Sequence, residues 1–185
     1  GEENENVNAD FAFGDIEYSF IHDTWRRVIT SSLLTSYVRE LHKYAAIGLE
    51  EISSRQQFTP FRTQCKIFSH WRDADNTVNA SRTALEVGQS FKMLGMIPQG
   101  IEIYTETINM WKKYEPTEGT DRIAGFSPEV LESLDLENIT GLVKVQTALG
   151  QAIGSIYKGD LSKSAQAFRD ALEVSKLCKQ CFSQP

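Results

Sequence analysis

The chain has 185 residues, of which 41% are apolar and 24% are charged. This is the composition of a soluble globular domain large enough to bury a core, and it excludes a wholly disordered, collagenous or fibrous chain. No apolar run approaches the 18 residues that a membrane span needs, so we expect no integral membrane contact.

The formal charge is −6, but it is unevenly distributed. The acidic residues concentrate in 1–25 and 115–137, which leaves the rest of the chain with an excess of Lys and Arg. These basic residues form no cluster longer than a pair, such as Arg26-Arg27. The pattern is typical of solvated helix faces, and it predicts a protein that does not bind nucleic acid.

Cysteine usage and the N-terminal segment bear on the compartment. The chain has three cysteines, an odd number, and it is large enough to fold without disulfides. No secretory signal is recognisable, so we expect free thiols and an intracellular, cytoplasmic location. Residues 1–13 are polar and rich in Asn and Glu, which predicts a disordered acidic tail or a remnant left by cloning.

Residues 14–77 are predicted to hold the N-terminal helices of a single helical domain that covers 14–185. Apolar residues at helical spacing begin at Ile16 and include Trp25. A second helix over 33–53 carries an apolar face made of Tyr37, Leu41, Tyr44, Ala45, Gly48 and Ile52. Pro60 suits the first position of a third helix, which carries Phe61, Cys65, Phe68 and Trp71.

Four further helices are expected in the C-terminal part, with an acidic insertion over 115–135 between them. They cover about 78–94, 98–114, 136–158 and 161–181. Gly95 suits a left-handed helix cap, and Ser127-Pro128 predicts a short extra helix inside the insertion. No run shows strand alternation. The sequence therefore predicts an all-α chain of about seven helices plus a short extra one, arranged as antiparallel hairpins.

Two windows of the chain, 95–110 and 159–174, share one spacing of residue types. In each, a glycine is followed by a small residue five positions later, an aromatic four after that and a small residue three further on. The matched residues are Gly95, Gly100, Tyr104 and Thr107 in the first window and Gly159, Ser164, Phe168 and Ala171 in the second. Small residues let two helices approach closely, and the aromatic fills the space beside them.

This spacing resembles the tetratricopeptide repeat (TPR) family. Gly88 and Phe91 match the small and aromatic positions of the family's first helix. Before the second window, Gly150 matches the small-residue position that Gly88 occupies only if two extra residues are allowed before the turn. The resemblance implies TPR-like hairpins over 78–114 and 136–185, in a solenoid-like stack.

No catalytic or metal-binding constellation is recognisable. Cys178 and Cys181 have the spacing of a zinc half-site, but Cys65 and the histidines provide no second pair. The chain has no HExxH motif, no nucleophile elbow and no phosphate-binding loop. We therefore expect no metal, no cofactor and no enzymatic activity.

The TPR resemblance implies a protein-interaction module or adaptor that binds a protein or peptide segment in a concave groove. The groove-facing candidates are Arg82, Leu85, Gln89, Lys92, Met93, Leu149, Ile153 and Tyr157. Leu85 and Gln89 stand where the family's chaperone-binding members have lysine and asparagine, so we do not expect binding of chaperone C-terminal tails. The acidic insertion is expected either to lie against the basic helix faces or to offer Ile123, Phe126 and Leu131 to a partner.

Two alternatives remain open at this point. The chain could be a helical enzyme or small-ligand sensor with a pocket between helices, which buried Asp, Glu or His in a closed pocket would favour. It could also be a structural subunit of a larger complex, docked through an exposed aromatic residue such as Trp25 or Trp71.

Overall fold

The computed structural model describes residues 23–112, 126, 131, 133–156 and 161–182. The chain divides into two compact units, 1–34 and 35–185. In the first unit the structure describes α1 (Asp23–Ser32), on which Val28 and Ile29 are exposed.

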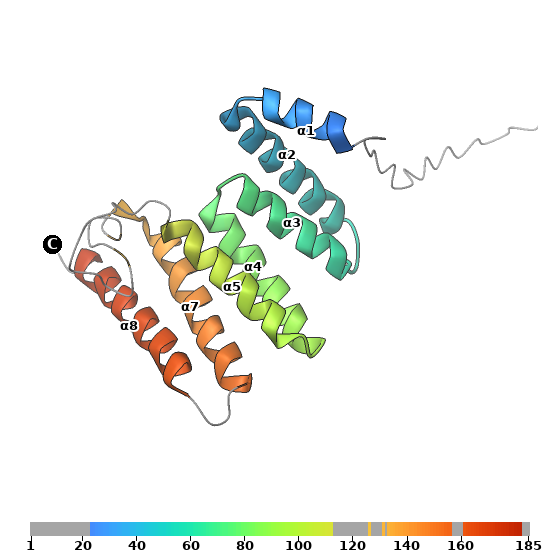
Figure 1. Ribbon diagram of the computed structural model, residues 1–185. Coiled ribbons are helices and arrows are strands. Elements are labelled where there is room, and N and C mark those ends of the chain that lie inside the picture. The colour runs from blue at the N-terminus through green and yellow to red at the C-terminus, as the bar shows by residue number, and fades with distance from the viewer. Residues whose placement is uncertain (1–22, 113–125, 127–130, 132, 157–160, 183–185) are drawn as a thin grey trace, which may run out of the picture. The chain divides into compact units, whose positions relative to one another are not determined.

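The described part of the second unit is helical (Figure 1). Its helices are α2 (Thr35–Ser54), α3 (Phe61–Asp73), α4 (Thr77–Met93), α5 (Ile97–Lys112), α7 (Leu136–Ile156) and α8 (Ser162–Phe182). With α1, the described residues contain seven helices and no strand, which confirms the all-α prediction. Most of the predicted short helix after Ser127 lies outside the described residues.

The turns between helices are closed by local hydrogen bonds. Gly95 has a φ of 75°, as predicted for the cap of α4, and the Met96 N–H reaches the Phe91 carbonyl at 2.8 Å. Asn76 is the N-cap of α4, and its side-chain oxygen accepts a hydrogen bond from the Asn79 N–H at 3.0 Å. Pro60 lies one position before α3 rather than inside it, in an extended conformation.

Asp135 caps α7 in the same way. Its carboxylate accepts hydrogen bonds from the backbone N–H of Asn138 at 2.8 Å and from that residue's side-chain amide at 3.0 Å. These bonds favour the ionised form and lower the pKa of Asp135 below its usual value. The capped end fixes where α7 begins.

Each helix of this unit packs against the next one described: α2 on α3, α3 on α4, α4 on α5, α5 on α7 and α7 on α8. In addition, α4 contacts α7 directly. Thr77 bonds to Asn138 at 2.7 Å, and a side chain at Gly141 would meet Ser81 at 3.3 Å. The later residue of α4, Ser81, lies against the later residue of α7, Gly141, so the two helices run parallel.

The buried apolar residues form two clusters that share α5. One cluster joins α5, α7 and α8 with two residues of the predicted insertion, and it consists of Tyr104, Ile108, Trp111, Phe126, Leu131, Ile139, Leu142, Val145, Ala152 and Val174. The other joins α2, α3 and α4 with Met110 of α5, and it consists of Ala46, Ile67, Phe68, Trp71, Ala80, Ala84, Val87 and Met110. The α4/α5 pair therefore has core on both sides.

The structure differs from the sequence-based expectation for three sets of aromatic and apolar residues. On α2 the buried residues are Ala46 and Ser53, whereas the predicted apolar face, including Tyr37, Leu41, Tyr44 and Ile52, is exposed. Trp71 is buried and donates a hydrogen bond to Glu50 at 2.7 Å, so it is not an exposed docking residue. The third set, in the acidic insertion, is described with the site.

Candidate functional site

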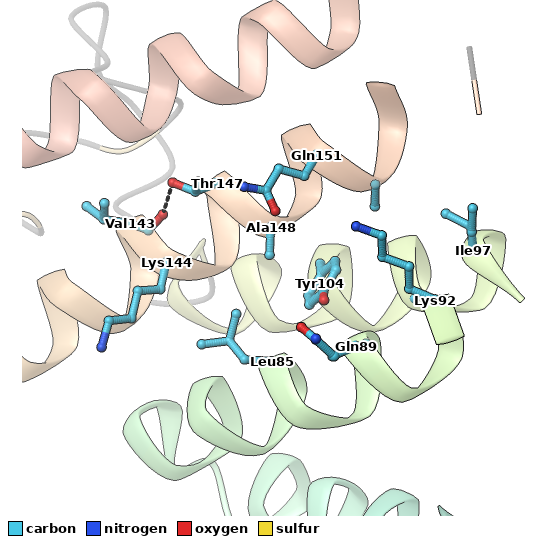
Figure 2. A pocket seen from close by; sticks show the side chains of 13 residues that line it. Leu85, Gln89, Lys92, Ile97, Tyr104, Val143, Lys144, Thr147, Ala148 and Gln151 are labelled. Carbon is cyan, nitrogen blue, oxygen red and sulfur yellow. Dashed lines mark hydrogen bonds between the residues drawn. The ribbon is translucent and has the colours of Figure 1, made fainter. Parts of the chain in front are cut away.

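A cavity of about 350 Å³ lies between α4, α5 and α7 (Figure 2). The residues that line it are Leu85, Gly88, Gln89, Lys92, Ile97, Gly100, Tyr104, Val143, Lys144, Thr147, Ala148, Gln151 and Ala152. The cavity is open to solvent on one side, where the longer polar side chains of α4 and α7 lie.

The floor of the cavity is made by a close contact between α4 and α5. Tyr104 is only 6% exposed and packs against Gly88 so closely that a Cβ at Gly88 would overlap its ring. A Cβ at Gly100 would lie 3.3 Å from the Gly88 carbonyl oxygen. Gly100 thus faces α4 and Tyr104 is buried, as the spacing predicts. Burial raises the pKa of Tyr104, so the floor presents a neutral hydroxyl.

The α7/α8 pair repeats this contact with different residues. A Cβ at Gly150 would lie 3.1 Å from the ring of Phe168. The Ser164 hydroxyl donates a hydrogen bond to the Gly150 carbonyl at 2.7 Å. The contact of Gly150 with Phe168 therefore corresponds to that of Gly88 with Tyr104. Likewise, Ser164 lies against the Gly150 carbonyl as Gly100 lies against the Gly88 carbonyl.

Among the described residues that line the cavity, the charged side chains are two lysines. Lys92 comes from the last turn of α4 and Lys144 from α7. Both are exposed, and neither forms an ion pair with another residue in the part of the chain that the structure describes. The side-chain amides of Gln89 and Gln151 lie between them (Figure 2). The cavity is therefore polar and cationic at its rim and uncharged at its floor.

The groove residues proposed from the sequence fall into separate places. Leu85, Gln89 and Lys92 line the cavity. Met93, next to Lys92, is 81% exposed and does not line it. Arg82 lies in a neighbouring cavity, where its guanidinium contacts Glu50 at 2.7 Å.

On α7 the cavity is lined by residues that the sequence analysis missed. Leu149 packs against the larger core cluster and Ile153 is half-buried, but neither lines the cavity. Lys144, Thr147 and Gln151 do.

A two-residue shift explains this difference. The 64-residue repeat spacing holds after the turns, whereas Gly88 and Gly150, whose contacts are equivalent, are only 62 residues apart. Positions two residues apart on a helix point about 200° away from each other. Adding 64 to the number of an α4 residue therefore gives a residue on the opposite face of α7 from the one that lines the cavity. Aligning the chain on Gly88 and Gly150 would have selected Lys144, Thr147 and Gln151.

Two of the residues proposed for the acidic insertion, Phe126 and Leu131, are not available as a docking surface. Phe126 is fully buried and Leu131 is 1% exposed, both within the larger core cluster. The Lys112 ammonium lies 5.8 Å from the centre of the Phe126 ring, close enough for a cation–π contact. Ile123 and Tyr157 lie outside the described residues.

A second cavity, of about 320 Å³, lies between α2, α3 and α4. Its lining includes Glu50, Glu86 and Arg82. The Glu50 carboxylate accepts hydrogen bonds from both Arg82 and Trp71 at 2.7 Å. The charge of Glu50 is therefore balanced within the chain, in contrast to the lysines of the first cavity.

No group of three His, Cys, Asp or Glu side chains in the described ranges is placed to hold a metal ion. Cys178 and Cys181 belong to α8, but their side chains are not among those that the structure describes, so the prediction about them stays a prediction. Among the helices described, none is long and apolar enough to cross a membrane.

Comparisons with known proteins leave the family open. No protein-family model matches the chain, and neither the curated proteins nor the solved structures gave a significant match.

Proposed function

We propose that residues 77–182 form two TPR-like hairpins, α4/α5 and α7/α8, stacked as in a solenoid, and that they act as a non-catalytic protein-interaction module. The repeated contacts of Gly88 with Tyr104 and of Gly150 with Phe168 support this arrangement. The parallel contact between α4 and α7 supports it too, because it places the first helices of both hairpins side by side.

The observation that carries the proposal is the composition of the cavity between α4, α5 and α7. Its floor is uncharged, its rim holds two amides and two lysines, and its lining contains no Asp, Glu, His or Cys in the part of the chain that is described. The described lining therefore lacks the carboxylate, imidazole and thiol groups that many enzymes use, and its remaining acid–base groups are Lys92, Lys144 and Tyr104. An open cavity with an uncharged floor and amide groups at its rim suits a segment of another protein, whose peptide groups bond to the amides while a side chain enters the cavity.

A variant that fills the cavity tests this function. Gln151 is exposed at the rim, so Gln151→Trp should block the cavity without disturbing the core. Gln166 on α8 is also exposed but lies outside the cavity, so Gln166→Trp is the matched control.

Affinity capture with quantitative mass spectrometry compares the wild type with both variants, after circular dichroism has shown equal melting. We expect at least one partner to be lost with Gln151→Trp and retained with Gln166→Trp. Identical partners for all three proteins would contradict binding in this cavity.

A further inference from the structure

We propose that the cavity between α4, α5 and α7 selects an extended segment with two acidic side chains about four residues apart and an apolar residue between them. This inference rests on the proposed function and names the chemistry of its partner. It follows from the charge, the spacing and the floor of the cavity.

The charge comes from Lys92 and Lys144. The lining contains these two cations and no acid, and neither lysine is paired within the described part of the chain. Figure 2 shows Lys144 at one end of the cavity, beside Leu85 and Val143, and Lys92 towards the other end, which Ile97 closes. An anionic partner would therefore meet a positive charge at two separate points.

The spacing of the two charges follows from the register of the parallel helices. Thr77 contacts Asn138 and Ser81 lies against Gly141, so each α7 residue lies level with the α4 residue about 60 positions earlier. Lys144 is then level with residues 83–84 of α4, and Lys92 lies eight or nine residues further along. At 1.5 Å per helical residue, the backbone positions of the two lysines are about 12–14 Å apart along the cavity.

An extended chain covers that distance in about four residues, since it advances about 3.3 Å per residue. Acids at adjacent positions of an extended chain point to opposite sides, so only one of them would face the cavity, whereas acids four residues apart point to the same side. The amides of Gln89 and Gln151 lie between the lysines, where each can donate to and accept from a peptide group. Leu85, Ala148 and Tyr104 offer apolar surface to a side chain in the middle of the segment.

The second cavity shows that this selectivity belongs to one site. There Arg82 is paired with Glu50, and Glu86 adds a further negative charge. An acidic segment would meet net negative charge at that cavity. We therefore expect such a segment to bind only between α4, α5 and α7.

Four heptapeptides, acetylated and amidated to remove terminal charge, test the inference by NMR titration of the ¹⁵N-labelled full chain. They are Gly-Glu-Ala-Leu-Ala-Glu-Gly, the adjacent-acid isomer Gly-Ala-Glu-Glu-Leu-Ala-Gly, and the forms of the first peptide with Gln or Lys at both Glu positions. We expect the spaced-acid peptide to shift the amide signals of Gly88 and Gln151. It should bind about tenfold more tightly than the adjacent-acid isomer and lose affinity at high salt.

Charge reversal tests the two lysines directly. Lys92→Glu and Lys144→Glu should each weaken the spaced-acid peptide about tenfold, and the double variant should bind the Lys peptide instead. Lys163 is exposed on α8 outside the cavity, so Lys163→Glu is the control and should leave binding unchanged.

Equal affinity for the two acidic isomers would contradict the claim that the cavity prefers acidic side chains about four residues apart. Equal binding of the Gln peptide would overturn the acidic selectivity while leaving a segment-binding cavity, and so the proposed function, intact. If no peptide shifts the cavity signals, this inference is wrong, and the loss of partners with Gln151→Trp decides the proposed function separately.

Discussion

The α2/α3 and α4/α5 helix pairs are both held together by helix packing, but their specific contacts are of different kinds. Between α2 and α3, the Nδ1 atoms of His42 and His70 lie 2.9 Å apart, and Trp71 donates to Glu50. Between α4 and α5, Gly88 and Tyr104 are in close contact and Gly100 faces the α4 backbone. The α2/α3 pair is joined by polar side chains across the interface. The α4/α5 pair instead depends on glycines, which have no side chain and let the two helices approach closely.

This difference explains why only part of the chain shows a repeat spacing. Close approach requires small residues at particular positions, and the α7/α8 pair uses Gly150 and Ser164 in the same way. A polar contact between long side chains tolerates many positions and residue types. The α2/α3 pair can therefore pack as a hairpin without any of the spacing found in the later pairs.

The largest expected effect is at Gly100. A leucine there would press against the Gly88 carbonyl and the Phe91 side chain, and a backbone carbonyl cannot move aside. We expect Gly100→Leu to lower the free energy of unfolding by about 1–3 kcal/mol. Urea unfolding followed by circular dichroism measures this, and an unchanged midpoint would contradict the close contact between α4 and α5.

Gly88→Ala should have the next largest effect. The added Cβ would overlap the ring of the buried Tyr104, which would have to move from its packed position, so we expect a loss of about 1–2 kcal/mol. Gly150→Ala is the matched comparison. Phe168 is 41% exposed and can rotate away, so the cost there should be clearly smaller. Equal losses of unfolding free energy in the two variants would show that the Phe168 ring is held as firmly as the Tyr104 ring.

Gly48 on α2 should respond in the opposite direction. No heavy atom lies within 4 Å of a Cβ built at this position, so nothing in the described structure requires a glycine. Since glycine inside a helix is less favourable than alanine, Gly48→Ala should stabilise the chain by about 0.5–1 kcal/mol. A destabilised Gly48→Ala variant in the same unfolding assay would indicate a close neighbour at α2.

The smallest expected effect is a pH dependence of the α2/α3 contact. Burial and the neighbouring His42 lower the pKa of His70, although the charges of Asp73 and Lys66 also act on it. A lowered pKa means that the unfolded chain binds the proton more readily. The contribution of His70 to stability is therefore present above its unfolded pKa of about 6.5 and falls as the pH drops below it.

Thermal unfolding at pH 7.5 and pH 5.5 measures this dependence. We expect the wild type to lose more stability on acidification than His42→Gln, in which the second imidazole is missing. The difference should be small because His70 is only half-buried and water screens its charge. An equal loss in both proteins would show that His42 does not contribute to the lowered pKa of His70.

Only the α4 side of the candidate site could be predicted from the sequence, and the reason that the α7 side was missed is physical. Leu85, Gln89 and Lys92 were found because they share a helix with Gly88, whose position the repeat spacing marks. Lys144, Thr147 and Gln151 were missed because two extra residues before the turn rotate α7 relative to the repeat spacing. Helix periodicity shows which residues share a face, but not which neighbour that face contacts.

The sequence by itself determined the helical class, the positions of the helices and several of their ends, because periodicity, proline and glycine act over a few residues. It also marked the contact between Gly100 and α4. Only the tertiary structure decided that the apolar face of α2 is exposed and that Phe126 and Leu131 are buried. It also decided that Lys92 and Lys144 border one cavity, whose described lining contains no acidic residue. These features depend on contacts between residues far apart in the chain, which no local pattern specifies.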